Sequence, residues 1–427
     1  MPQSPLNKTA RRLLDHTDAS GAWITLAEHR TRFAPPPRPR RDPARELIDA
    51  TERAGLRGRG GASFPIATKL KAVADGRRRP VVIANGVEGE PASTKDEFLM
   101  AAAPHLVLDG VLLAAAAVGA DDVILAVAHG GACRAIRRAL QERYTAEPRA
   151  SKVRIIDVPD RYVAGEERSI VNLVNGGPAI PTASPPRPFE RGVAGRPTLV
   201  QNVETLAHLT LINRFGADWF RQVGTPESPG TTLMTVSGAV GRRGIYEIAI
   251  GTPLSRLLAA AQGTPDGVGS VLVGGYAGTW LTPEQAGSVT LDSRGLAPVG
   301  GTMGCGVVAV LPEGSCGLRE TAGVMRWMAD QTAGQCGPCV FGLAAIADAT
   351  DQLLRGTGGS VVLSRLTKWA GDVEGRGACR YPDGAVRMLR SALSTFAVDV
   401  DQHLAGRPCR GVGRPRTLPL PAIPGAA

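Results

Sequence analysis

Short apolar runs alternate with longer segments of helical periodicity in the first half of the chain. The runs PVVIAN at 80–85 and DVILAVA at 122–128 are bounded by turn residues and are typical of buried strands. The segments 47–54, 66–73 and 105–118 repeat apolar residues at helical spacing. Because strands alternate with helices, the pattern predicts an α/β domain with a largely parallel sheet covered by helices, extending to about residue 225.

A different pattern starts at Thr231. Two strand-like runs, TLMTVSGAV and YEIAIG, flank the short turn GRRG and predict a hairpin. The segment 253–261 predicts a helix, and SVLVGG at 270–275 predicts another strand. Together these elements indicate a small α+β module.

Beyond Gly317 the pattern turns helical. Amphipathic helices are expected at 318–333, 343–355, 360–373 and 384–404. These segments predict a C-terminal helical bundle.

The two ends of the chain differ in composition from the rest. The N-terminal part is basic and contains the run PPPRPRRDP, which favours extended chain, and the tail holds five prolines. The expected organisation is a basic arm or linker (1–45), the α/β domain (46–228), the α+β module (229–316), the helical bundle (317–405) and an irregular tail (406–427).

The overall composition is that of a folded protein. With 43% hydrophobic and 21% charged residues, a wholly disordered chain is excluded. The longest weakly interrupted apolar stretch, 106–120, is shorter than the roughly 20 residues that span a bilayer, so we expect no direct membrane insertion. The N-terminus lacks the apolar core of a secretory signal, so we expect a cytoplasmic protein with reduced thiols.

The net charge is +10, from 49 Lys+Arg against 39 Asp+Glu, and 43 of the basic residues are arginines. This bias toward arginine is more typical of genome base composition than of a nucleic-acid task, so we expect no nucleic-acid partner. The simpler interpretation is a solvated surface. The sharper one is an acidic protein partner, because a basic face steers such encounters.

A glycine-rich segment, GLRGRGGASFP at 55–65, lies between two predicted helices. Glycine permits positive φ and lets backbone amides approach an anion, and the following helix presents its positive N-terminal end. A tight turn without a ligand is the simpler interpretation. The position ahead of a helix and a strand favours a phosphate site, as in nucleotide or flavin binding.

Three polar clusters follow this glycine loop. Because open α/β sheets bind ligands at the carboxyl ends of strands, the run NGVEGEPASTKDEF at 85–98 is a candidate site, with loose surface charge as the alternative. The run RYVAGEERSIVN at 161–172 adds two adjacent acids. The run GRPTLVQNVETLAHL at 195–209 offers polar residues at a loop-to-helix start, where helix capping competes with ligand contact.

Seven cysteines in a reducing compartment indicate metal ligation before disulfides. Cys336 and Cys339 form a C-x2-C motif in GQCGPCVFG, and Cys379 follows 40 positions later. Soft thiolates at this spacing suit an iron–sulfur cluster or zinc, with the distant ligand closing the site. A redox dithiol is the alternative, which the location between helices disfavours.

These five motifs, in this order, resemble the family of flavoprotein (NADH-binding, F-type) subunits of respiratory complex I and of NAD-linked formate dehydrogenases and hydrogenases. The resemblance covers roughly residues 46–405, and the run at 85–98 is also partly similar to the C subunit of the Rnf complex. It implies a multidomain α/β chain with a Rossmann-like FMN-binding domain, a ubiquitin-like β-grasp (SLBB-type) module and a C-terminal α-helical bundle with an iron–sulfur site.

The resemblance also implies an NADH dehydrogenase-type oxidoreductase. NAD(H) would be the substrate, a hydride would pass to FMN, and single electrons would leave through a 4Fe-4S or 3Fe-4S cluster. The expected partner is a ferredoxin-like or thioredoxin-like iron–sulfur protein.

Roles for individual residues follow from the same resemblance. Glu90 and Glu167 are expected to be catalytic, and Lys69 is expected to balance the charge of reduced flavin. The cluster ligands implied are Cys336, Cys339 and Cys379. The residues implied to contact FMN or NAD(H) are Gly58, Gly60, Gly61, Ala62, Phe64, Lys69, Asn85, Glu88, Glu90, Tyr162, Glu166, Glu167, Arg187, Asn202 and Thr205.

Five positions depart from the family's motifs. Ala72 and Arg187 stand where the family stacks aromatic rings on adenine, although arginine can itself stack on a base. Val87 and Gln201 replace an aspartate and an asparagine of the flavin site, and Ala333 replaces the first cluster cysteine.

The substitution at Ala333 leaves the fourth cluster ligand open. The alternatives are a three-iron cluster, a four-iron cluster with an outside or non-cysteine ligand, and a cluster completed by Cys316 or Cys409.

Three functions are consistent with these observations. The first is a flavin and iron–sulfur electron-transfer protein, one component of a larger enzyme, that oxidises NADH. The second keeps both redox centres but exchanges electrons with ferredoxin, its basic surface replacing the adenine stack. The third is a degenerate, non-catalytic scaffold, which predicts a protein without flavin.

Overall fold

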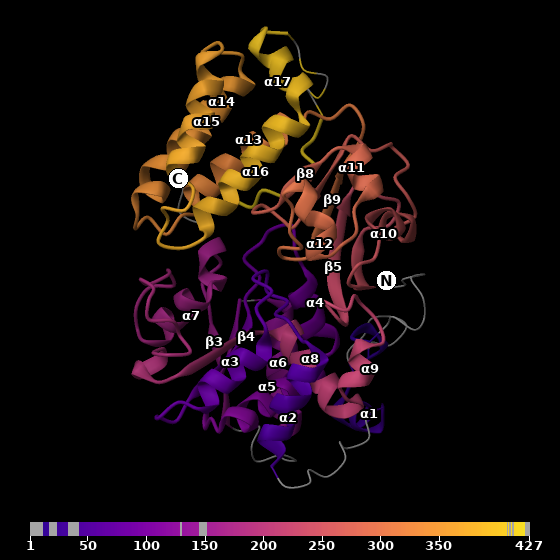
Figure 1. The fold of residues 1–427 in the computed structure, drawn as a ribbon, viewed down its shortest axis with the longest axis vertical. Helices are drawn as coiled ribbons and strands as arrows, with labels where there is room; N and C mark the ends of the chain where they lie inside the picture. The colour runs from indigo at the N-terminus through magenta and orange to yellow at the C-terminus, as the bar shows by residue number, and fades with distance from the viewer. Residues whose placement is uncertain are drawn as a thin grey trace. The chain divides into compact units, whose positions relative to one another are not determined.

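The computed structural model describes residues 12–16, 24–32, 42–128, 130–144, 152–407, 409, 411 and 414–422. The chain separates into two compact units, whose elements are labelled in Figure 1. Unit 1 comprises residues 1–89, 94–234 and 245–252, and unit 2 comprises residues 90–93, 235–244 and 253–427.

Unit 1 is built on a four-stranded sheet of the predicted α/β type. Its strands are β1 (Val81–Gly86), β2 (Asp122–Val127), β3 (Val153–Asp157) and β4 (Thr198–Asn202). All are parallel, in the order β3-β2-β1-β4. The apolar runs predict β1 and β2 correctly but miss β3 and β4, whose shorter runs are interrupted by Arg154 and Gln201.

The predicted helices of this unit are confirmed at 47–54, 66–73 and 105–118. The first begins four residues earlier than predicted, at Pro43, because the Asp42 side chain accepts a hydrogen bond from the backbone N–H of Arg45. The helices are α1 (Leu26–Arg32), α2 (Pro43–Ala54), α3 (Ile66–Ala74), α4 (Lys95–Ala102), α5 (Pro104–Val118), α6 (Gly131–Tyr144), α7 (Glu167–Val174), α8 (Val203–Phe215) and α9 (Ala217–Arg221), with the 3-10 turns η2 (Leu14–His16), η4 (Tyr162–Gly165) and η5 (Val193–Gly195).

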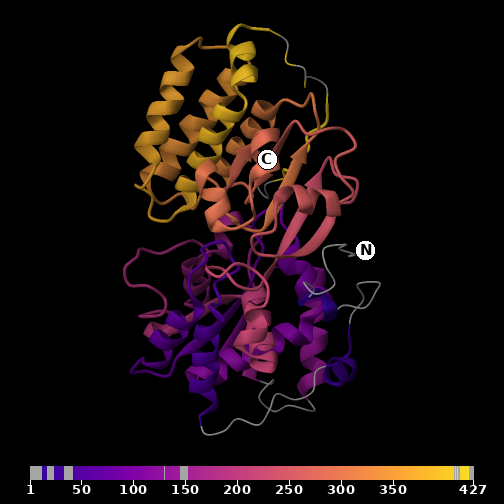
Figure 2. The same cartoon turned by 45° about the vertical axis from the view of Figure 1, so that its right-hand side comes forward.

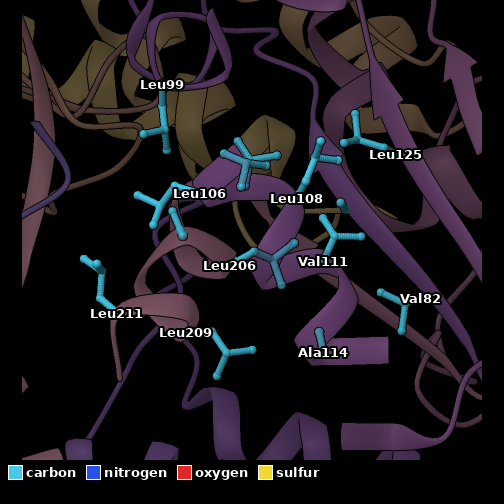
Figure 3. Packing of buried hydrophobic residues seen from close by; sticks show 14 of the residues in the cluster. Val82, Leu99, Leu106, Leu108, Val111, Ala114, Leu125, Leu206, Leu209 and Leu211 are labelled. Atoms are coloured by element: carbon cyan, nitrogen blue, oxygen red, sulfur yellow. The ribbon is translucent and has the colours of Figure 1, made fainter. Parts of the chain in front are cut away.

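Alternate strand residues face two different layers. Val82 belongs to the larger core cluster, in which leucines of α5 and α8 interdigitate (Figure 3), whereas Ile83 belongs to a smaller cluster with Ile170 of α7. The helices α5 and α8 approach closely at Gly110, where a Cβ atom would lie 2.0 Å from the carbonyl oxygen of Leu206. The parallel sheet is thus covered on both faces, as expected for this class.

Part of the predicted N-terminal arm is folded instead of extended. Within the described residues of 1–45, α1 forms at 26–32 and Leu13 is fully buried. The backbone N–H groups of residues 12–14 all donate to the carboxylate of Glu247, at 2.9 to 3.0 Å, which fixes this segment in place. The proline run ahead of Asp42 lies outside the described residues.

A second sheet of five strands follows. Its strands are β5 (Thr231–Gly238), β6 (Gly244–Ala249), β7 (Ser270–Val273), β8 (Thr279–Leu281) and β9 (Val307–Leu311). Their order is β6-β5-β9-β7-β8, with β5 parallel to β9 and β7 antiparallel to both of its neighbours. The predicted strands at 232–240, 246–251 and 270–275 are confirmed, and the predicted helix at 253–261 is α10 (Leu254–Ala260).

The predicted C-terminal helices gather in unit 2, where α13 to α16 lie side by side in both views (Figures 1 and 2). The segment 384–404 is two helices and not the single one predicted. Phe396 leaves helical geometry at φ −108° and packs edge-to-face on Trp280, with ring centroids 5.3 Å apart. The remaining helices are α11 (Pro283–Ser288), α12 (Ser293–Leu296), η6 (Ala297–Val299), α13 (Gly317–Asp330), the π-helix η7 (Pro338–Leu343), α14 (Ala344–Leu354), α15 (Val361–Val373), α16 (Tyr381–Thr395) and α17 (Ala397–Leu404).

Among the described residues, no single helix combines the length and apolar composition needed to cross a membrane. The helices α4 and α5 reach that length only as a pair, and their axes bend by 97° where they join.

Candidate functional site

The carboxyl ends of β1 and β4 meet where the strand order reverses. From β1 the sheet continues through β2 to β3 on one side, and β4 lies on the other side of β1. Asn85 and Asn202 are register partners at these two ends. Because open α/β sheets bind ligands outside the carboxyl ends of their strands at such a switch point, this edge is the candidate binding site of unit 1.

The glycine loop packs on the first turn of α8 at this switch point. A Cβ atom on Gly60 would lie 3.2 Å from the Cβ of Asn202, and the backbone N–H of Arg59 donates to the hydroxyl of Thr205 at 2.9 Å. The loop residues Gly60, Gly61 and Ala62 are exposed. Backbone of this kind beside a helix N-terminus is suited to an anion.

Asn202 is the N-cap residue of α8. Its Oδ1 accepts hydrogen bonds from the backbone N–H groups of Glu204 and Thr205, at 2.9 and 3.4 Å. Its Nδ2 donates to the carboxylate of Asp96 at 2.7 Å. The capping role is therefore present, and a direct contact of Asn202 with a ligand stays a prediction.

A buried ion-pair network supports the switch point. The Nζ of Lys95 lies 2.7 Å from Asp96 and 2.8 Å from Glu204, and all three side chains are buried. Burial alone would lower the pKa of Lys95, but the carboxylates of Asp96, Glu204 and Glu88 together raise it above its ordinary value. Lys95 is therefore a charged residue that joins α4 to α8.

Replacement of Lys95 by Met should lower the free energy of unfolding by about 3–5 kcal/mol, because two buried carboxylates lose their cation. Urea denaturation measures this difference. The control is Lys71→Met, which removes a more exposed pair with Glu52 and should cost less than about 1 kcal/mol. Equal losses in the two variants would contradict the importance of the buried network.

Glu88 also acts as a helix cap. Its carboxylate accepts hydrogen bonds from the backbone N–H groups of Lys95, Asp96 and Glu97, at 3.0 to 3.1 Å, which form the first turn of α4. A contact of Glu88 with FMN stays a prediction.

Sequence reasoning missed one charged residue of this site, Arg59, and placed Lys95 at the site without predicting its burial. The guanidinium of Arg59 is buried and donates to backbone carbonyls of residues 57, 229 and 231, and burial lowers its pKa to about 10. The position of Arg59 inside the glycine-rich segment at 55–65 is the sequence feature that could have identified it. Lys95 lies within the run at 85–98, but nothing in its spacing indicates burial.

Lys69 and Glu167, 98 positions apart in the chain, form an ion pair between α3 and the start of α7. The Nζ of Lys69 lies 2.8 Å from the Glu167 carboxylate and 5.9 Å from the ring centroid of Phe64. The carbonyl of Phe64 accepts a hydrogen bond from the N–H of Gly58, so the pair adjoins the glycine loop. Both charged side chains are partly exposed and accessible to a ligand.

The segment after β1 packs on η4 and the start of α7. The Nδ2 of Asn85 donates to the carbonyl of Gly165 at 2.8 Å, and a Cβ atom on Gly89 would lie 2.7 Å from the carbonyl oxygen of Tyr162. Glu166 is the N-cap residue of α7. The structure thus brings Asn85, Tyr162 and Glu166 together around one loop.

Glu90 and Arg187 have different surroundings. Glu90 belongs to unit 2 and is buried. Its carboxylate accepts hydrogen bonds from the backbone N–H groups of Tyr276 and Ala92, at 2.8 and 3.2 Å. These bonds give Glu90 a structural role, and its catalytic role stays a prediction. Arg187 is exposed, whereas the nearby Phe189 packs against the core of unit 1. Of these two, Arg187 is the residue open to a ligand.

The residues at the switch point fit FMN. The exposed backbone at 60–62 offers amides to a phosphate. The buried Nε2 of Gln201, at the end of β4, has no hydrogen-bond partner among the described residues. Because an unpaired buried donor is costly, a bound group with acceptor atoms would stabilise this position.

Cys336, Cys339 and Cys379 lie together in unit 2. Burial would raise the pKa of Cys336, but backbone N–H groups of Ala378 and Cys339 directed at its sulfur lower it. Burial, together with the charges of Cys336 and Cys379, raises the pKa of Cys339 to about 12. Three converging thiols with backbone N–H donors fit the donor set of an iron–sulfur cluster.

The alternative in which Cys316 or Cys409 completes this cluster is wrong. The sulfur of Cys339 accepts the backbone N–H of Ala333, so the three thiols lie at the C-terminal end of α13. Cys316 is the N-cap residue at the other end of this 14-residue helix, which is about 20 Å long. Cys409 lies with Cys316, and the fourth ligand is therefore neither of them.

Comparisons with known proteins agree with this geometry. The family of the Nuo51 FMN-binding domain matches residues 51–211, and that of the NADH-ubiquinone oxidoreductase-F iron-sulfur binding region matches residues 319–403. The first match includes the switch point and the second includes the three thiols.

Full-length relatives are similar along most of the chain. The NADH-quinone oxidoreductase F subunit 2 of Rhizobium meliloti is 29% identical over 93% of this chain and 96% of its own length. The NADH-quinone oxidoreductase F subunit of Streptomyces coelicolor is 30% identical over 85% and 84%. Among solved structures, the NAD+-reducing [NiFe]-hydrogenase in its H2-reduced state is similar at a TM-score of 0.78 and 31% identity, covering 85% of this chain and 63% of the hydrogenase chain.

Proposed function

Because the chain belongs to the family of NADH-quinone oxidoreductase F subunits, we propose that NADH is oxidised at the switch point of unit 1. We further propose that electrons leave beside the three thiols of unit 2. Members of this family are NADH dehydrogenase-type enzymes with FMN and a 4Fe-4S cluster. When bound, FMN accepts a hydride and releases single electrons, which the cluster passes on. The observation that carries the proposal is the packing of the glycine loop on the N-terminus of α8.

The glycine loop and the first turn of α8 would hold the FMN phosphate. The backbone amides at 60–62 donate to its oxygens, and the positive end of α8 favours its charge. Thr205 keeps the loop in place by accepting the N–H of Arg59. Lys95 and its two carboxylates keep α4 and α8 fixed beneath the site.

The ion pair of Lys69 and Glu167 would act beside the reacting rings. The ammonium of Lys69 balances negative charge on the reduced flavin, and the carboxylate of Glu167 accepts hydrogen bonds from the nicotinamide amide or the ribose hydroxyls. The partial exposure of both side chains supports this proposal.

Replacement of Arg187 by Ala should raise the apparent KM for NADH by about 5- to 150-fold, because a stacked base is worth about 1–3 kcal/mol. Steady-state kinetics with NADH and an artificial acceptor measure this change. Arg191→Ala, which removes another exposed arginine four residues away, is the control and should leave the KM unchanged. An unaltered KM in Arg187→Ala would remove the stacking role.

The second sheet supports the proposal of a β-grasp module of SLBB type at 229–316. A hairpin, the helix α10 and three further strands follow each other along the chain. The first and last strands are parallel neighbours at the centre of the order β6-β5-β9-β7-β8. This is the arrangement of ubiquitin-like β-grasp folds.

The partner that we propose is a ferredoxin-like or thioredoxin-like iron–sulfur protein docking beside Cys339, in a cytoplasmic complex. Val340 and Phe341, which follow Cys339 directly, are 43% and 74% exposed. The side chain of Arg380, next to Cys379, is 90% exposed. The exposed apolar pair beside a cluster ligand suits a protein that must approach the cluster closely, and Arg380, which is paired with Asp383 at 2.8 Å, adds a charged group next to the third thiol.

An anaerobic absorption spectrum before and after addition of NADH tests the proposed function, with flavin and iron quantified in the same sample. Bleaching of flavin and cluster bands by NADH is the expected result. Flavin and cluster bands that bleach only with reduced ferredoxin would indicate that a protein, and not NADH, is the electron donor. A reconstituted protein without either chromophore would leave only the non-catalytic scaffold.

A further inference from the structure

Three buried side chains of metal-ligand type converge in unit 2. The sulfur atoms of Cys316 and Cys409 and a ring nitrogen of His403 lie within 4.8 Å of one another. Cys316, Cys409 and His403 are 4%, 6% and 7% exposed, respectively. They come from the start of α13, the C-terminal tail and the last turn of α17, so only the fold brings them together.

The separations suit a single metal ion. The Sγ of Cys316 lies 3.5 Å from the Nε2 of His403. In a tetrahedral zinc site, bonds of about 2.3 Å to sulfur and about 2.0–2.1 Å to nitrogen put these two ligand atoms about 3.6 Å apart. A plain hydrogen bond between thiol and imidazole gives a similar separation, but it does not account for a second buried thiol at the same place.

Backbone groups already support both sulfur atoms. The N–H of Arg319 donates to Cys316 at 3.3 Å, and the N–H of Gly411 donates to Cys409 at 3.4 Å. Cys316 also lies at the positive end of the α13 dipole. Burial and the neighbouring Cys409 raise the pKa of Cys316 to about 12, and these donors offset only part of that rise, so a bound metal ion would have to displace the thiol proton.

This group is distinct from the cluster site. It lies about 20 Å from the three cluster thiols, at the opposite end of α13. The match to the family's iron–sulfur region covers residues 319–403, which excludes both Cys316 and Cys409.

We propose that Cys316, His403 and Cys409 bind one zinc ion, with an oxygen atom as the fourth ligand. Two thiolates and an imidazole are a donor set that zinc binds tetrahedrally, and closed sites of this kind are structural. Asp399 lies one turn before His403 on α17, on the same face, and its charge acts on Cys316, which makes it a candidate for the oxygen ligand.

The ion would fasten the C-terminal tail to α13. The chain at Gly411 passes so close to Cys316 that a Cβ atom would lie 2.4 Å from its backbone nitrogen. Further along, the N–H groups of Thr417 and Leu418 donate to the carboxylate of Glu320 at 3.0 and 3.1 Å. Cys409 precedes these contacts, so a metal bond at this residue fixes the point from which the tail continues along the helix.

The first test measures zinc, iron and flavin in the full chain purified anaerobically, in the wild type and in Cys316→Ser, Cys409→Ser and Cys133→Ser. Cys133 is also buried but belongs to α6 of unit 1, so it controls for the loss of a cysteine. We expect about one zinc per chain in the wild type and the control, and a loss of more than about tenfold in the other two, with iron and flavin unchanged. Loss of iron in place of zinc, or a zinc-free wild type after reconstitution with zinc, would overturn the proposal.

The second test needs no variant. X-ray absorption at the zinc edge of the wild-type protein should show two sulfur ligands at about 2.3 Å and two nitrogen or oxygen ligands at about 2.0–2.1 Å. A shell of four sulfur atoms, or a Cys316–Cys409 disulfide in anaerobically prepared protein, would overturn the assignment. Neither test depends on a reaction with NADH.

Discussion

Replacement of Cys339 by Ser is expected to remove the cluster iron while FMN stays bound. Cys339 is buried, and the charges of both Cys336 and Cys379 act on its sulfur, so all three thiols lie close together around it. Changes to residues that merely support metal ligands already cost about 10- to 100-fold in metal affinity, and loss of a direct thiolate ligand should cost more. Iron and FMN per chain, quantified in one anaerobically reconstituted sample, measure the effect.

Two further cysteine variants separate this result from general damage. Cys133→Ser removes a buried thiol of unit 1, and Cys316→Ser removes one at the other end of α13. Both should keep their iron. Full iron content in Cys339→Ser would move the cluster away from the C-x2-C motif, whereas loss of FMN together with iron would indicate unfolding of the chain.

The architecture of unit 1 could be predicted because its elements are long and strongly patterned. The helix α5 and the strands β1 and β2 consist almost entirely of apolar residues that the core buries. The strands β3 and β4 could not be found in the same way, since Arg154 and Gln201 interrupt runs of only five residues. The positions of β3 and β4 in the sheet depend on the helices that connect the strands. A local pattern of apolar residues does not contain this information.

Breaks within helical segments depend on tertiary contacts. The pattern from 384 to 404 is continuous at helical spacing, and neither proline nor glycine marks the end of α16. The break occurs because Phe396 packs on Trp280, more than 100 positions earlier. Local propensity cannot contain that information.

The same distinction between local patterns and distant contacts applies to the candidate sites. The glycine loop and the C-x2-C motif could be predicted because each is contiguous in the sequence. The burial of Lys95 and the convergence of Cys316 with His403 could not, since their partners lie 109 and 87 positions away. Glu90 lies inside a contiguous motif, yet the motif does not indicate what its side chain does. Its carboxylate accepts a hydrogen bond from the backbone N–H of Tyr276 and so stabilises a turn of unit 2.

Replacement of Gly60 by Val is expected to weaken FMN binding by about 10- to 150-fold. A Cβ atom at this position already lies 3.2 Å from the Cβ of Asn202, and the two γ-methyl groups of valine extend beyond it, so the loop must move away from α8. Loss of one hydrogen bond to a charged phosphate costs about 1.5–3 kcal/mol, which is the expected range of affinity. Fluorescence titration of FMN into protein freed of flavin measures the dissociation constant.

The matched control is Gly371→Val in α15, where an added Cβ atom meets nothing within 4 Å. This variant introduces the same side chain in unit 2 and should bind FMN as the wild type does. Gly60→Ala should lie between the two, because its single Cβ requires Asn202 to shift by only a few tenths of an ångström. Equal FMN affinity in all three variants would exclude the glycine loop as the phosphate site, whereas loss of iron in Gly60→Val would show that the substitution unfolds more than unit 1.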